Sequence, residues 1–243
     1  KDEEFKWQAV ECFQKHWDIN APNFGEMFKE ATEKCFNLLT SAHRFPKTMI
    51  EIFATETEPE AVRNMFAVLF DESRDLTERI NFFIDEAERL RSSYGADKWT
   101  NHFQDQNSIS TYLWLMYPDK YYIYKFTECK RVAKTLKSDF IPKAGDPNNL
   151  EKSKELYDEI AQKLREDSEL RQLLSDNLAK DSYLDPQLVT LTVDVAFFIK
   201  TYLKQEEPKW WPSKAEYDPG ISAEEWVNIL NNPDIFSNES LTL

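Results

Sequence analysis

Glycine is scarce in this sequence, and its copies are far apart. Only Gly25, Gly95, Gly145 and Gly220 occur in 243 residues. Sheet-rich folds need many tight turns, and such turns favour glycine. A Walker A loop needs paired glycines to wrap a phosphate, and a G-x-G-x-x-G loop needs three. The sequence therefore favours helices and contains neither kind of nucleotide-binding loop.

Histidine and cysteine are equally rare, which removes most metal-ligand and nucleophile patterns. Each occurs three times, without C-x-x-C, H-x-x-x-H or H-x-E spacing, and no G-x-S-x-G elbow is present. Cys12 and Cys35 stand among apolar residues at helical spacing, so we expect buried, reduced thiols of an intracellular protein. We expect no catalytic residue, metal ligand or cofactor-binding residue in this chain.

No apolar run is long enough to cross a membrane. The most apolar stretch, 186–199, contains Asp194 and is shorter than the roughly 20 residues that a spanning helix needs. The chain begins with charged residues, so we expect no secretion signal. Its net charge of −14 opposes non-specific binding of nucleic acid by the molecule as a whole. We expect a soluble, cytoplasmic domain without membrane contact.

Apolar residues recur at helical spacing along most of the chain, which predicts an all-α, irregular fold of about ten helices. The clearest helix is expected to begin at Asp75 and to stop at Gly95. Asn23 is expected to cap an earlier helix, and Ser108 a later one.

A further helix is expected over 184–203. Its inward residues are predicted to include Leu188, Phe198 and Tyr202. The β-branched run 189–193 leaves a strand open as an alternative.

A segment with two prolines and a glycine divides the sequence. We expect this segment, 138–149, to link a helical lobe of 1–137 to a second lobe of 150–243.

The second lobe contains a long, proline-rich loop, 204–220, with Trp210 and Trp211 at its centre. This pair is either an exposed aromatic clamp or an anchor that pins the loop to the core. The last residues, 240–243, carry no capping signal, so we expect the natural chain to continue.

One short segment carries a net positive charge, opposite to that of the chain as a whole. Between Lys120 and Lys143 there are seven basic and two acidic residues. Three of the lysines share a helix face, and tyrosines precede them. Basic side chains hold phosphates and aromatic rings stack on bases, so the segment suits nucleic acid. The candidate residues are Lys120, Tyr121, Tyr122, Tyr124, Lys125, Lys130, Arg131, Lys134 and Lys137. The alternative is a solvated helix face beside tyrosines that pack into the core.

Several stretches, most of them with aromatic residues, carry a resemblance to a known family. They are 5–10, 13–18, 58–63, 110–125, 210–212 and 221–226. Together they resemble the N-terminal region of McrB-like AAA+ proteins, the motor subunits of modification-dependent restriction systems. The chain is more helical and more acidic than the better-known members.

The resemblance implies an AAA+ motor, usually a GTPase, C-terminal to this chain, so GTP or ATP with Mg²⁺ would bind only there. It also implies an AAA+ ring for the whole protein and a nuclease in a separate partner subunit. In that family the N-terminal module commonly reads DNA, and some members flip a modified base into an aromatic pocket.

Two functions follow as expectations. The first is a non-catalytic targeting module, monomeric by itself, that contacts plain or modified double-stranded DNA for a restriction or phage-defence motor. The alternative is a protein–protein interaction or scaffold module of the same kind of assembly, without DNA contact.

Overall fold

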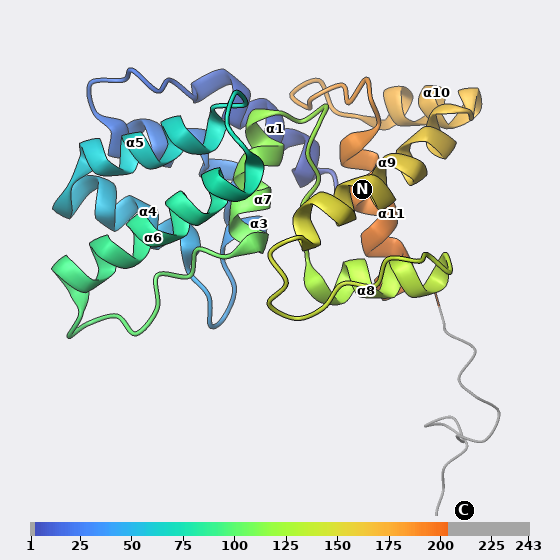
Figure 1. Cartoon of the computed structure of the whole chain (residues 1–243). Coiled ribbons are helices and arrows are strands. Elements are labelled where there is room, and N and C mark those ends of the chain that lie inside the picture. Colours follow the sequence, from blue (N-terminus) through green and yellow to red (C-terminus); the bar gives the residue numbers. More distant parts are fainter. Residues whose placement is uncertain (1–2, 204–243) are drawn as a thin grey trace, which may run out of the picture. The chain divides into compact units, whose positions relative to one another are not determined.

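Helices are the only regular elements in residues 3–203, the part of the chain that the computed structural model describes. The one β-type pairing there is an isolated bridge between Ser41 and Arg44. The all-α prediction is confirmed. In chain order the helices are α1 (Phe5–His16), α2 (Phe24–Ala31), α3 (Phe36–Leu39), α4 (Pro46–Ile52), α5 (Pro59–Phe70), α6 (Leu76–Gly95), α7 (Gln106–Met116), α8 (Phe126–Thr135), α9 (Asn149–Arg165), α10 (Ser168–Asn177) and α11 (Val189–Thr201) (Figure 1).

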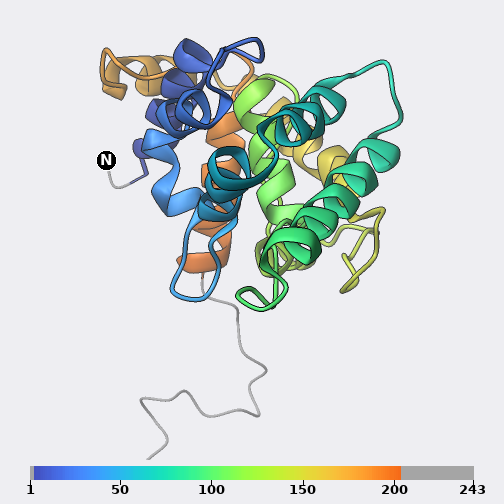
Figure 2. The ribbon, with the colours of Figure 1, turned by 90° about the vertical axis from the view of Figure 1, so that its left-hand side faces the viewer.

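Helix α7 runs through the interior of this part of the chain (Figure 2). Its residues 108–115 are all buried, and α1, α3 and α5 pack against it. The indole Nε1 of Trp114 donates to Thr190 Oγ1 of α11 at 3.2 Å. Neighbouring helices surround α7, and this explains why it carries few charged residues on any side.

The first turn of α7 is capped by Asp105. Its carboxylate accepts from the amides of Asn107 and Ser108, at 3.0 and 3.2 Å. Ser108 Oγ in turn accepts from the Asp105 amide at 3.0 Å. The prediction that Ser108 is the cap is wrong, because Ser108 is the reciprocal partner in a capping box.

Helix α11 is shorter than the sequence indicated, and the strand alternative for 189–193 is wrong. Asp185 lies ahead of the helix and accepts from the amides of Thr190 and Leu191, at 3.1 and 2.8 Å. Because these bonds cap the helix from a loop, Leu184 lies outside it and is 75% exposed.

Leu188 and Ile199 are buried as predicted, but two aromatic residues of the predicted inward face are exposed. Val193, Ala196 and Ile199 face the core, whereas Phe198 and Tyr202 are 52% and 62% exposed. The helix carries apolar residues on most sides, so its periodicity could not select the inward face.

Helices from both sides of 138–149 pack together. Helix α11 lies against α8, which precedes this segment, and against α9, which follows it. Residues up to Leu203 form one compact unit. The segment is therefore a connection between α8 and α9 inside that unit. Trp210 and Trp211 lie outside the described residues.

All three cysteines are buried and free, as predicted for Cys12 and Cys35. Burial raises the pKa of the Cys129 thiol to about 12, which keeps it protonated at neutral pH. Within residues 3–203, no helix combines the length and apolarity that crossing a membrane requires.

Candidate nucleic-acid interface

Helix α8 separates its apolar and basic residues onto two faces. Cys129, Val132 and Ala133 are buried, and α11 packs against the helix. Lys134 is exposed and Lys130 is half-buried, with its Nζ 5.5 Å from the centre of the Phe126 ring. The 3.6-residue period puts the two lysines one turn apart on the outer side.

The cations on and just after α8 form no ion pair with carboxylates of the described residues. Among residues 3–203, no Asp or Glu oxygen lies within 4.0 Å of the charged nitrogens of Lys130, Arg131, Lys134 or Lys137. We call these four residues the α8 basic face. Because α11 packs on the apolar side of α8, Lys130 and Lys134 lie on its other side, and neither forms an ion pair within residues 3–203.

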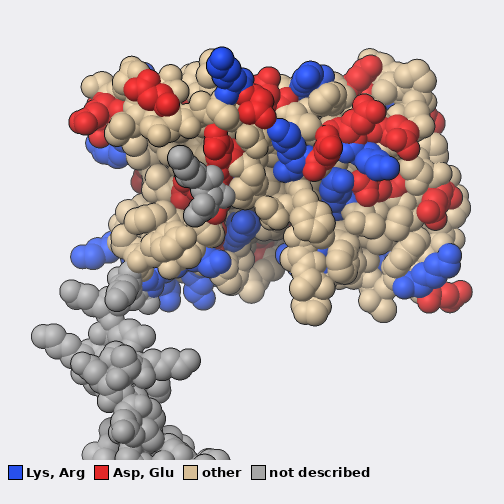
Figure 3. Space-filling model, turned by 180° about the vertical axis from the view of Figure 1, so that it is seen from behind, with Lys and Arg blue, Asp and Glu red and all other residues tan. Residues whose placement is uncertain are grey.

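Positive side chains gather along the lower edge of the molecule in Figure 3, beside the point where the described part of the chain ends. Helix α8 lies along this edge in Figure 1. Acidic and basic side chains are interspersed over the upper part of the same view. Lysine and arginine side chains therefore gather at one edge of the described part, although the chain as a whole is acidic.

The three candidate tyrosines are core residues. Tyr121, Tyr122 and Tyr124 are 8%, 6% and 3% exposed. The Tyr122 hydroxyl donates to Asp158 at 2.9 Å, and the Tyr121 hydroxyl accepts from Arg79 at 3.1 Å. A base cannot reach rings buried to this extent, so the alternative interpretation, core packing, describes them.

Two of the candidate lysines, Lys120 and Lys125, are not free surface cations. Lys120 forms an ion pair with Glu72, and that hydrogen bond raises the pKa of Lys120. Lys125 stands at the N-terminus of α8, half-buried, and burial lowers its pKa. Neither side chain belongs to the open surface that the α8 basic face presents.

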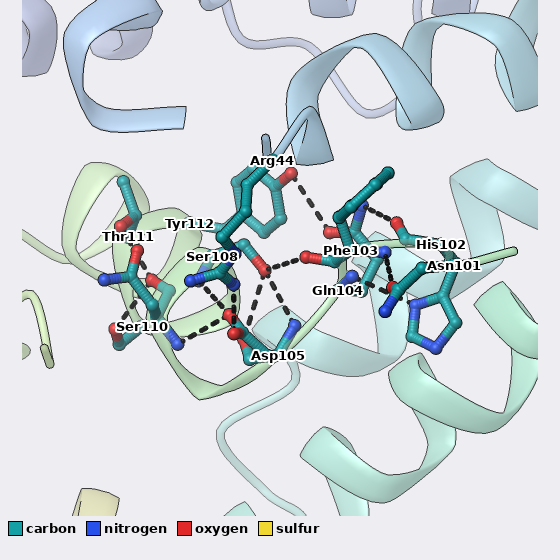
Figure 4. A network of polar contacts seen from close by, with 11 residues as sticks. Arg44, Asn101, His102, Phe103, Gln104, Asp105, Ser108, Ser110, Thr111 and Tyr112 are labelled. Carbon is teal, nitrogen blue, oxygen red and sulfur yellow. Dashed lines mark hydrogen bonds and ion pairs between the residues drawn. The ribbon is translucent and has the colours of Figure 1, made fainter. Parts of the chain in front are cut away.

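A hollow of about 640 Å³ lies where α7, α8 and the connection before α9 meet. Its lining includes Asn107, Lys125 and Gly145. Arg44 also lines it but is paired with Asp105, the cap of α7 (Figure 4). Most charge in the hollow is thus neutralised within the chain.

The end of α11 holds functional candidates that the sequence reasoning missed. Phe198 and Tyr202 are more than half exposed, with ring centres 5.5 Å apart, and Lys200 is exposed between them in the chain. The Arg131 guanidinium donates to the Leu203 carbonyl at 2.6 Å, which joins the α8 basic face to this end of α11. Which side of α11 is exposed depends on how α8 and α9 pack against it. The sequence alone therefore did not identify these two rings as exposed.

No cluster of three or more His, Cys, Asp or Glu side chains in residues 3–203 has the geometry of a metal site. No protein-family model, curated protein or solved structure matches the chain. The resemblance to McrB-like proteins therefore stays a prediction.

Proposed function

We propose that this chain is a non-catalytic targeting module that binds nucleic acid through phosphate contacts of the α8 basic face. The observation that carries the proposal is a group of four cations at α8 that have no carboxylate partner within residues 3–203, in a chain of net charge −14. In a larger protein of the McrB-like kind, this contact would help an AAA+ motor engage DNA.

The contacts available to α8 are with the backbone of the nucleic acid. Lysine and arginine bind phosphate oxygens and release condensed counterions, which stabilises the complex without reading the sequence. The buried rings of Tyr121, Tyr122 and Tyr124 supply no base contact. The α8 basic face should therefore bind plain and modified duplexes equally.

The proposal is tested by fluorescence anisotropy with labelled plain and modified duplexes at about 50 mM salt. Replacing both Lys130 and Lys134 by Ala should weaken binding at least about tenfold, because two phosphate contacts are lost. The matched control replaces Lys29 and Lys180 by Ala, since both are exposed, lie outside α8 and form no ion pair among the described residues.

Two results would overturn the proposal. One is the absence of wild-type binding at low salt. The other is an equal loss of affinity in the α8 variant and the control variant, which would mean that only the total charge matters.

A second candidate function, protein–protein interaction, is favoured by α10. This helix contains no buried residue, and its Leu173 is 52% exposed. A surface helix with an exposed leucine suits a partner helix or groove. This function predicts that neither duplex nor single-stranded DNA binds at low salt.

A further inference from the structure

We infer that the end of α11 and the α8 basic face form one site for single-stranded nucleic acid, in which unpaired bases stack on Phe198 and Tyr202. The inference rests on the proposed function and names its substrate class. It begins from two aromatic side chains that are 52% and 62% exposed, where large apolar groups are normally covered.

The two exposed rings lie next to each other. Their centres are 5.5 Å apart, and their planes are tilted by 39°. Phe197 meets Tyr202 edge-on at 6.2 Å and supports it from the side. Rings held in this way lose little conformational freedom when a flat ligand covers them, which favours stacking.

The two rings adjoin positive charge. Arg131 of α8 binds the Leu203 carbonyl, one residue beyond Tyr202, and Lys134 follows Arg131 along α8. Lys200 adds an exposed cation in the last turn of α11. A strand whose bases cover Phe198 and Tyr202 would therefore find cations within reach of its phosphates.

Aromatic rings beside a positive groove are the features by which proteins bind single strands without sequence preference. In a duplex the bases are already stacked and paired, so the exposed rings offer it nothing. An acidic protein would match the cations but would gain less from two exposed aromatic faces than unpaired bases do. The ring pair thus discriminates by strandedness, whereas the α8 basic face does not.

The test compares a labelled thymidine oligomer with a duplex of equal length in the anisotropy assay. Phe198→Leu with Tyr202→Leu keeps the surface apolar but removes both π-faces. We expect single-strand affinity to fall at least about fivefold and duplex affinity to stay within about twofold. The matched control is Phe36→Leu, because Phe36 is 65% exposed on α3. Circular dichroism and the urea midpoint of each variant check that it is folded.

The outcomes separate the inference from the proposed function. Unchanged single-strand affinity in the double-leucine variant, or duplex binding without single-strand binding, would overturn the inference and leave the α8 phosphate contacts intact. Loss of both affinities in the Lys130 and Lys134 variant supports the proposed function independently of the rings. Absence of all binding by the wild type would overturn both.

Discussion

At the scale of single residues, Asp185 joins distant parts of the chain. Its carboxylate accepts from the Trp7 indole at 3.3 Å and from the amides of Thr190 and Leu191. The side chain is fully buried. Burial raises its pKa to about 6, although these donors act in the opposite direction.

A carboxyl with a higher pKa in the folded chain than in the unfolded chain stabilises the fold at low pH. The contribution of Asp185 is complete below about pH 4 and is lost as the pH rises through about 6. Asp185→Asn removes this titration. We expect the stability advantage of the wild type over Asp185→Asn to shrink by about 2 kcal/mol between pH 4 and pH 7, at about 1.4 kcal/mol for each pKa unit.

Urea denaturation of both proteins at several pH values in this range measures the difference. A stability difference that is constant with pH, or that grows as pH rises, would contradict the raised pKa.

Residue-level prediction from the sequence was accurate where local chemistry decides. Asn23 and Asp75 stand at the start of their helices as predicted. Each side chain accepts a hydrogen bond from a backbone amide three residues further on, so the cap depends only on the local sequence. The tyrosines of the candidate site were undecided, because the segment 117–125 has no period from which an inward face follows. Only the packing of α6 and α9 beneath them decides their burial.

At the scale of elements, α6 ends at Gly95 as predicted, but this residue is glycine for a reason other than the predicted one. Its backbone is not in the left-handed region that a helix-stopping glycine usually adopts. Instead, a Cβ at Gly95 would come within 1.8 Å of the Trp99 ring. Glycine is required there because the Trp99 indole, which also meets Phe53 edge-on, lies directly on the helix.

This reason predicts the sign of a substitution. Gly95→Ala should destabilise the protein by about 1–3 kcal/mol, because Trp99 has to move from its position. In an open helix, the same change would stabilise by about 1 kcal/mol through helix propensity. Equilibrium urea unfolding distinguishes the two, and a stabilised Gly95→Ala variant would refute the packing role.

Helix α11 marks the limit of element-level prediction. The sequence identified a helix in this region, but Asp185 caps it from outside, and its exposed aromatic residues were assigned to the core. A helix that is apolar on several sides has its orientation fixed by its neighbours, here α8, α9 and the Lys6–Asp194 ion pair from α1.

At the scale of the whole described part, the first helix contacts α11 and the loop before it. Lys6 Nζ lies 2.8 Å from Asp194, and the amide of Tyr183 donates to the Trp7 carbonyl. These contacts join α1 to the last helices, so residues on both sides of 138–149 depend on one another. The sequence could not reveal this dependence. A segment with prolines and a glycine has the same composition whether it separates two lobes or connects two packed helices.

The shared core predicts one unfolding transition. Tryptophan fluorescence and far-ultraviolet circular dichroism should give coincident urea midpoints for residues 3–203, as expected of a cooperative unit. Two separated transitions would instead indicate that the chain divides at 138–149.

The charge distribution leads to the central claim, that the α8 basic face contacts phosphates. Its most direct test is the slope of log binding constant against log salt concentration for a DNA duplex. Each phosphate contact contributes about −0.9 to this slope. Replacing Lys130 and Lys134 by Ala should make the slope shallower by about 1.8, while the Lys29 and Lys180 control keeps the wild-type value. A slope that is the same in wild type and the Lys130 and Lys134 variant would contradict the account.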